Sequence, residues 1–116
     1  MVLICGLPNS GKTTFSGQYG NVIHLDDYGR RINEVVSEAT GDVVVEGVFV
    51  LRHMRKKLLE SYRGTGRKVC IWLDVPPDVC EAREDRGRPT ALIWNCYNAL
   101  EPPTYEEGWD EIIVIR

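Results

Sequence analysis

The chain has 116 residues, with 43% hydrophobic and 27% charged side chains and a formal net charge of −3 at pH 7. This length suits one domain, and the composition is that of a folded globular protein rather than a disordered one. The charge excludes a protein that holds nucleic acid mainly through net positive charge, and no apolar run approaches the ~20 residues of a membrane helix. Because no basic leader precedes the first apolar run, we expect a cytoplasmic protein with one domain over residues 1–116.

The predicted elements alternate between strands and helices along the chain. Short apolar runs bounded by turn residues predict strands, and apolar residues that recur every three or four positions predict helices. In chain order they are a strand at 2–5, a helix at 13–19, a strand at 21–25, a helix at 32–39, a strand at 43–45, a helix at 51–62, a strand at 69–75, helices at 78–86 and 93–100, and a strand at 111–116. The basic residues of the helix at 51–62, Arg55 among them, are expected on its solvated side. The alternation predicts an α/β fold with a mostly parallel five-stranded sheet and helices on both faces.

Residues 6–13, Gly-Leu-Pro-Asn-Ser-Gly-Lys-Thr, match the pattern G-x-x-x-x-G-K-[ST] completely and lie between a predicted strand and a predicted helix. Such a loop wraps backbone N–H groups around phosphate, while Lys12 reaches the β and γ phosphates and the Thr13 hydroxyl ligates Mg²⁺. The pattern predicts a nucleoside triphosphate with magnesium, and the lack of an N-K-x-D motif favours ATP. The residues expected to contact the nucleotide here are Pro8, Asn9, Ser10, Gly11, Lys12, Thr13 and Thr14.

Acidic side chains follow the second and third predicted strands. Asp26 and Asp27 come at the end of the strand at 21–25, and in open parallel sheets this end of a strand borders the ligand crevice. We interpret Asp26 as a general base for an acceptor hydroxyl and Asp27 as the cap of the next helix. Glu46 follows the third strand, where it would hold a magnesium-bound water or a substrate hydroxyl. A helix-capping or ion-paired glutamate fits that position equally, so both interpretations stay open.

Three arginines, Arg83, Arg86 and Arg88, surround Gly87 near the predicted helix at 78–86. Arg83 and Arg86 are three positions apart and are therefore expected on one helix face. Phosphoryl transfer needs cations that close over the moving group and exclude water, so the segment is interpreted as a lid with a glycine hinge. Arg86 is the first choice for the contact with phosphate and Arg88 the second. Acidic residues interleave with them, so surface ion pairing would account for one or two of these arginines.

Four segments together resemble the P-loop phosphotransferases typified by the phage-type polynucleotide 5′-hydroxyl kinase. They are residues 6–13, the triplet 26–28, the strand end 73–76 that leads into the arginine-bearing lid, and the closing segment 101–112. The resemblance implies a P-loop NTPase-type three-layer sandwich with a lid. It also implies a general base at Asp26 and a lid arginine on the ATP phosphates at Arg86. Where the family has an arginine for the acceptor phosphate, this chain has Gly29 followed by Arg30, so Arg30 is expected to bind the acceptor.

The sequence therefore predicts a minimal ATP- and Mg²⁺-dependent kinase that transfers the γ-phosphoryl group to a nucleic-acid hydroxyl, at a 5′ end or on a hydroxymethylated base. A small-molecule or nucleoside kinase, a simple ATPase and a non-catalytic ATP-binding module remain alternatives, because all of them need the same phosphate cradle. The expected catalytic residues are Lys12, Asp26 and Arg86. Arg86 and Arg88 are expected on the nucleotide, Thr13 and Glu46 on the metal, and Asp26, Arg30 and Glu46 on the acceptor. The oligomeric state is left open.

Overall fold

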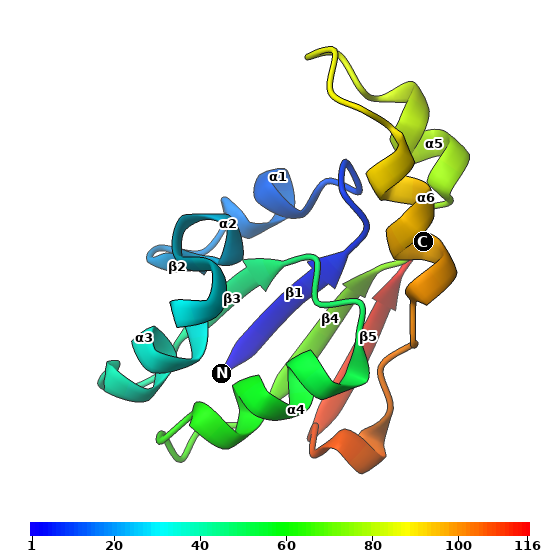
Figure 1. Ribbon diagram of the computed structural model, residues 1–116. Coiled ribbons are helices and arrows are strands. Elements are labelled where there is room, and N and C mark those ends of the chain that lie inside the picture. The colour runs from blue at the N-terminus through cyan, green and yellow to red at the C-terminus, as the bar shows by residue number, and fades with distance from the viewer.

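The computed structural model describes residues 1–116 and contains one sheet of five parallel strands in the order β2-β3-β1-β4-β5 (Figure 1). The strands are β1 (Val2–Gly6), β2 (Val22–His24), β3 (Val44–Gly47), β4 (Val69–Leu73) and β5 (Glu111–Ile115). β1 is apolar throughout and lies at the centre of the sheet, where both of its faces are covered. The α/β fold with a five-stranded sheet is confirmed, and all of its strand pairs are parallel.

The helices form layers on both faces of the sheet and a further group beyond the carboxyl ends of the strands. In chain order they are α1 (Lys12–Ser16), α2 (Leu25–Tyr28), the 3₁₀ turn η1 (Gly29–Arg31), α3 (Ile32–Glu38), α4 (Arg52–Ser61), α5 (Pro77–Ala82), α6 (Ala91–Ala99) and the 3₁₀ turn η2 (Tyr105–Glu107). α3 and α4 cover one face and α1 the other, while α5 and α6 lie beyond the strand ends (Figure 1). No helix combines the length and the apolar character that a membrane span requires.

The main core lies between the sheet and the helices α3 and α4. Successive side chains of a strand point to opposite faces, so Leu3 and Cys5 of β1 pack with Val36 of α3 and Leu58 of α4. Ile4 points the other way and belongs to a smaller core with the β4 residues Ile71 and Leu73, against which Phe15 packs after the P-loop. The two cores hold the sheet between two layers, which is the sandwich that the sequence predicts.

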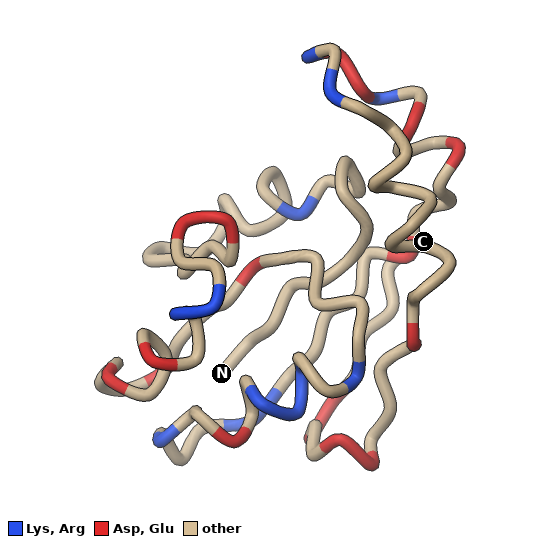
Figure 2. Tube along the Cα trace, in the orientation of Figure 1, with Lys and Arg blue, Asp and Glu red and all other residues tan.

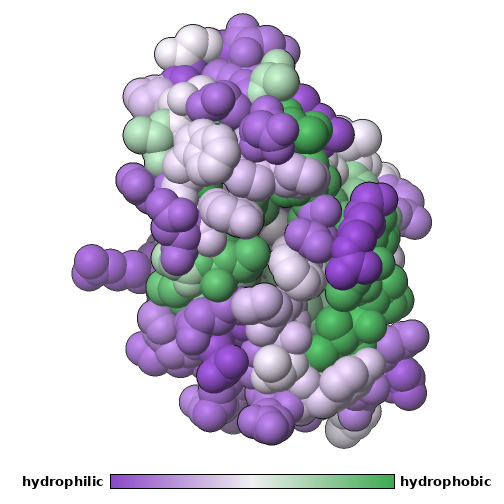
Figure 3. Space-filling view, turned by 90° about the vertical axis from the view of Figure 1, so that its right-hand side faces the viewer, coloured by the Kyte–Doolittle hydropathy of each residue, from purple (hydrophilic) through white to green (hydrophobic).

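α1 covers only part of its face of the sheet because it has five residues. Ile113 and Ile115 of the edge strand β5 are consequently 37% and 36% exposed. Figure 3 looks at the side of the molecule on which β5 and α6 lie, and hydrophobic side chains gather there between polar ones. Helix α1 ends at Ser16 rather than at the expected residue 19, because Gly17 follows and glycine is a poor helix former.

Arg55 contradicts the expectation that the bases of α4 are solvated, because its side chain is fully buried. Its Nε donates to Glu107 Oε1 at 2.7 Å and its Nη2 donates to Glu107 Oε2 at 3.0 Å. The remaining donors reach the carbonyl oxygens of Phe49 (2.8 Å) and Glu101 (2.7 Å). The pair joins α4 to η2 and so ties the carboxyl-terminal segment to the core. Helical spacing within α4 gives no sign of this partner, which lies 52 residues away.

Candidate active site

The loop between β1 and α1, residues 6–13, has the backbone geometry of a tight phosphate-binding turn. Asn9 and Gly11 have φ angles of +64° and +96°, a region that favours glycine and, after it, asparagine. At Gly6, a Cβ atom would lie 2.7 Å from Ser10 Oγ and 2.8 Å from the Leu73 carbonyl oxygen. Only glycine fits there, because the loop passes directly over the end of β4.

Two polar side chains of this loop, Ser10 and Lys12, are buried. Ser10 Oγ is buried and has no hydrogen-bond partner, and such atoms are rare in folded proteins. Lys12 is only 7% exposed, and its Nζ donates to the Leu7 carbonyl oxygen at 2.7 Å. Burial lowers the pKa of Lys12, and the charge of Glu46 opposes that shift. A phosphate in the loop would give the buried ammonium group of Lys12 a counter-charge.

The loop opens into a cavity of about 550 Å³, which we call the P-loop cavity. It brings together residues from separate parts of the chain: the phosphate loop with the start of α1, the end of β3, α2, the segment after α5 and the start of α6. Its walls are formed by Pro8, Asn9, Lys12, Thr13, Thr14, Asp26, Glu46, Gly47, Val48, Asp85, Arg86, Arg88 and Leu92. Of the predicted site residues, Ser10, Gly11 and Arg30 are not among them.

Glu46 reaches the P-loop cavity because β3 is the neighbour of β1 in the sheet. Its Oε2 lies 2.7 Å from His24 Nδ1, and the two residues are register partners at the ends of β3 and β2. The imidazole of His24 thus engages one of the two carboxylate oxygens of Glu46, and both interpretations of Glu46 stay predictions. A functional role for His24 was not predicted. The signal that could have found it is that His24 and Glu46 both lie near the carboxyl ends of predicted strands.

Asp26 lies in the first turn of α2, one residue beyond its start, and its side chain is exposed. The preceding strand ends at His24 because Leu25 already begins the helix. The expected capping role of Asp27 is wrong, since Asp27 lies within α2 and the helix expected at 32–39, α3, has Arg31 as its N-cap with no side-chain cap. Both carboxylates form a short acidic stretch at this end of the sheet (Figure 2).

The segment 83–90, which we call the lid, rests on the phosphate loop. Asn9 Nδ2 donates to Glu84 Oε1 at 3.0 Å, Arg88 Nη2 donates to Asn9 Oδ1 at 2.9 Å, and Arg83 Nη1 donates to the Asn9 carbonyl oxygen at 3.2 Å. Arg88 Nε also donates to Glu84. Figure 2 shows the resulting alternation of basic and acidic residues along this part of the trace. The lid is thereby latched to the loop that would hold the phosphates.

Arg83 and Arg86 do not share a helix face as expected, because α5 ends at Ala82. Glu84 Oε2 accepts the backbone N–H groups of Arg86 at 2.9 Å and Arg88 at 3.1 Å, and these contacts turn the chain out of the helix. The guanidinium group of Arg88 donates hydrogen bonds to Glu84 and Asn9, whereas Arg86 lines the P-loop cavity without an ion pair. Arg86 is therefore the lid cation that is free to meet a ligand.

Replacing Glu84 with glutamine should open the lid. The amide of Asn9 and the backbone N–H groups of Arg88 and Arg86 lower the pKa of Glu84 to about 2. Since this is below its ordinary value of 4.5, the latch is fully formed above pH 4.5 and is lost as the pH falls through about 2. In E84Q, an NH2 group would replace one of the two accepting oxygens at every pH, so part of the latch would be lost. We therefore expect tryptic cleavage after Arg86 at pH 8 to become several-fold faster.

The matched control for this experiment is Glu81→Gln on the preceding helix. Glu81 accepts a hydrogen bond from Trp94 Nε1 at 3.0 Å and makes no contact with the phosphate loop. Its substitution should leave the cleavage rate after Arg86 unchanged. Equal cleavage of wild type and E84Q would show that the Glu84 contacts do not hold the lid.

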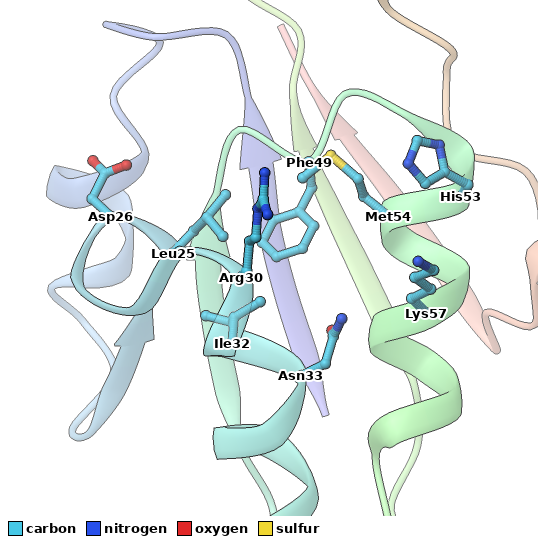
Figure 4. A pocket seen from close by; sticks show the side chains of 10 residues that line it. Leu25, Asp26, Arg30, Ile32, Asn33, Phe49, His53, Met54 and Lys57 are labelled. Carbon is cyan, nitrogen blue, oxygen red and sulfur yellow. The ribbon is translucent and has the colours of Figure 1, made fainter.

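A second cavity, of about 750 Å³, lies on the other side of Asp26; we call it the α3–α4 cavity. Figure 4 shows that η1 and α3 form one wall and α4 the other, with Phe49 behind them. The residues around it are Leu25, Asp26, Gly29, Arg30, Ile32, Asn33, Phe49, His53, Met54 and Lys57. Asp26 is the residue that lines both this cavity and the P-loop cavity.

No protein-family model and no curated protein matches the chain. Among solved structures, a gluconokinase from Sinorhizobium meliloti 1021 is similar with a TM-score of 0.72, and the likeness covers 98% of this chain and 80% of that one. The chain has the fold of a P-loop kinase. At 19% sequence identity the likeness concerns the fold, and it lends no support to the expected membership of the phage-type polynucleotide kinase family.

The donor groups in the P-loop cavity suit magnesium. No group of three or more histidine, cysteine or acidic side chains that could hold a metal ion is present. Mg²⁺ is commonly held by one or two protein oxygens together with substrate phosphates and water. The Thr13 hydroxyl and the Glu46 carboxylate, which both line the cavity, are oxygen donors of the required kind.

A third cavity, of about 560 Å³, lies between the phosphate loop and the end of β5. It shares Asn9 and Thr14 with the P-loop cavity, so the two cavities adjoin at the loop. Phe15, Arg83 and Ile115 contribute an apolar wall and a guanidinium plane. Such a combination is suited to a flat aromatic group.

Proposed function

We propose that residues 1–116 act as one kinase domain that transfers the γ-phosphoryl group of ATP to a hydroxyl group of a small molecule. The observation that carries this proposal is that Asp26 lines two cavities. One of them contains Lys12 and Arg86, and the other is large enough for an acceptor. A volume of about 750 Å³ is in the range of small-molecule sites. The similar fold of a gluconokinase is a further argument for a small acceptor.

On the donor side, the phosphates would lie in the P-loop cavity. Lys12 would neutralise the β and γ phosphates, and backbone N–H groups of residues 9 and 11–14 would bind their oxygens. Arg86 would contact the transferred group, and Arg88 would join it if the latch to Glu84 opened. The adenosine would extend into the third cavity, where Arg83 would stack on the base.

Thr13 and Glu46 would hold the magnesium ion. Held there, magnesium would supply positive charge that offsets the negative charge of the phosphate oxygens. His24 would keep Glu46 oriented through the contact between Nδ1 and Oε2. This arrangement leaves the second oxygen of Glu46 for the ion or one of its water ligands.

On the acceptor side, the hydroxyl group would lie against Asp26. Its oxygen would form a bond to the γ-phosphorus while the bond from that phosphorus to the β–γ bridging oxygen breaks. The proton of the hydroxyl would pass to the Asp26 carboxylate, and ADP would leave. Asp26 is exposed, so any acceptor that fills the α3–α4 cavity would also have to exclude water from the carboxylate.

A nucleic-acid hydroxyl is the second candidate acceptor. It is favoured by the resemblance of residues 26–28 and 101–112 to polynucleotide 5′-hydroxyl kinases. The basic residues Arg30 and Lys57 beside the α3–α4 cavity would suit a phosphate backbone. The small-molecule proposal is preferred because Arg30 and Lys57 are the only lysine or arginine residues that line the α3–α4 cavity, and two such residues do not form a long basic groove.

The proposal is tested by transfer of label from γ-labelled ATP with magnesium to a panel of acceptors. The panel contains sugar acids, alditols, sugar phosphates, nucleosides, 5′-hydroxyl oligonucleotides and DNA with hydroxymethylated bases. We expect label on one of the small molecules. Label only on an oligonucleotide would establish the second candidate. Phosphate release that does not depend on an acceptor would indicate an ATPase, and ATP binding without turnover would indicate a binding module.

A further inference from the structure

The α3–α4 cavity contains two cationic side chains that no carboxylate in the chain neutralises. Arg30 extends from η1 and Lys57 from α4, and neither takes part in an ion pair. Their neighbours differ in this respect: Arg31 pairs with Glu34 and Arg52 with Glu107. The two cations that line the cavity, Arg30 of η1 and Lys57 of α4, are therefore both without an ion pair.

The two cations lie on opposite walls of one space. In Figure 4, Arg30 projects into the cavity from η1, and Lys57 lies on the facing side of α4. Asp26 is the only carboxylate among the lining residues, and it lies at the end that borders the P-loop cavity. The charge of the cavity therefore changes along its length, from negative beside the site of transfer to positive between α3 and α4.

The floor of the cavity is apolar and its shape is supported from behind. Leu25, Ile32, Phe49 and Met54 contribute this surface. Phe49 has a φ angle of +28°, a strained backbone conformation for a bulky residue, and its carbonyl oxygen accepts a hydrogen bond from the buried Arg55. An ion pair beside such a surface is less weakened by water than one on an open face.

Asn33 contributes a polar atom without a hydrogen-bond partner to the same wall. Its side-chain oxygen is buried, and no donor in the chain reaches it. In Figure 4 its side chain points from α3 into the space between Arg30 and Lys57. A ligand with an O–H or N–H group at this place would satisfy an acceptor that the fold leaves unpaired.

We propose that the acceptor is a hydroxylated anion. Its carboxylate or phosphate group would bind Arg30 and Lys57, a further hydroxyl group would donate to Asn33, and the reacting hydroxyl would lie at Asp26. The inference rests on the proposed function for the identity of the reacting end and adds the chemical class of the acceptor. A neutral polyol would leave both cations without a partner, and this is the basis of the discrimination.

The test compares three six-carbon acceptors that differ in charge: an aldonic acid, a hexose monophosphate and the neutral alditol. We expect kcat/KM for the aldonic acid or the phosphate to exceed that for the alditol on the order of 10–100-fold, the range that a charge-assisted hydrogen bond supplies. Whichever anion is preferred identifies the anionic group as a carboxylate or a phosphate. Equal kcat/KM for the alditol and both anions would overturn the proposal.

Matched variants assign the effect to the two cations. Arg30→Ala and Lys57→Ala should each raise KM for the preferred anion about tenfold or more, whereas KM for ATP and the kcat/KM for the alditol should change much less. Arg31→Ala and Lys56→Ala remove neighbouring charges that do not line the cavity, and they should change none of these constants. Loss of activity toward the anion and the alditol alike in R30A and K57A would contradict a role in anion binding.

Calorimetric binding of the aldonic acid and the hexose monophosphate separates this inference from the proposed function, because it needs no turnover. Binding of either anion that R30A and K57A weaken, without label transfer, would support the anion site and contradict the kinase activity. Transfer to the alditol alone would support the kinase and contradict the anion site. Failure of both anions to bind at millimolar concentrations would also overturn the inference.

Discussion

The Asp26→Asn variant should transfer phosphoryl groups about 10²–10⁴-fold more slowly than the wild-type protein while binding ATP with unchanged affinity. Asparagine has nearly the same shape as aspartate but does not accept the proton of the acceptor hydroxyl. Asp26 borders both the cavity with Lys12 and the cavity proposed for the acceptor. Its exposed side chain makes a large loss of stability unexpected.

Asp27→Asn is the control for this variant, because Asp27 is the adjacent exposed acid of α2 and lines neither cavity. The measurements are the initial rate of label transfer, the affinity for ATP and Tm of each variant. An unchanged rate in D26N would refute the assignment of Asp26 as general base. Equal losses in D26N and D27N would point to the charge of the acidic stretch rather than to proton transfer.

The Arg55→Ala variant should lose about 3–5 kcal/mol of unfolding free energy, the range observed when one partner of a buried ion pair is removed. Both side chains are fully buried, so the change leaves the Glu107 carboxylate without its counter-charge. Domains of this kind have about 5–15 kcal/mol in total. R55A should therefore be marginally folded at 25 °C, as measured by urea denaturation.

A double variant isolates the cost of the uncompensated charge. Replacing a whole buried pair by apolar groups of similar volume is often neutral, so Arg55→Met with Glu107→Leu should be more stable than R55A. Burial by itself would raise the pKa of Glu107, but hydrogen bonds from Arg55, Trp109 and Thr104 lower it below 4.5. Stability from this group is present above pH 4.5 and declines as the pH falls further. The double variant should not show that decline, and equal stability of R55A and wild type would refute the argument.

The phosphate loop and the strands were predictable because the residues that define them are neighbours in the chain. The pattern of residues 6–13 contains its own glycines, lysine and threonine, and the apolar run of β1 directly precedes it. The limits of short helices were less accurate. α1 and α5 end earlier than expected because Gly17 follows the first and Glu84 takes backbone N–H groups after the second.

The contacts around the candidate site were harder to predict because they join separate elements. His24 meets Glu46 only because β2 and β3 are adjacent and in register. The lid latch depends on Asn9, whose partner Glu84 lies 75 residues further along the chain. Local periodicity describes which face of a helix is apolar, but it does not identify the element that covers that face.

The sequence by itself determined the type of fold and predicted the kind of ligand at its first loop. Apolar periodicity specifies strands and helices, and the loop pattern specifies a phosphate cradle, since both depend on contiguous residues. The tertiary structure decided the rest. The strand order β2-β3-β1-β4-β5 brings Glu46 beside the loop, and the packing of α3 and α4 leaves a cavity beside Asp26 with Arg30 and Lys57 on facing walls. These positions follow from which elements pack together, and that choice is made by the whole core rather than by any local segment.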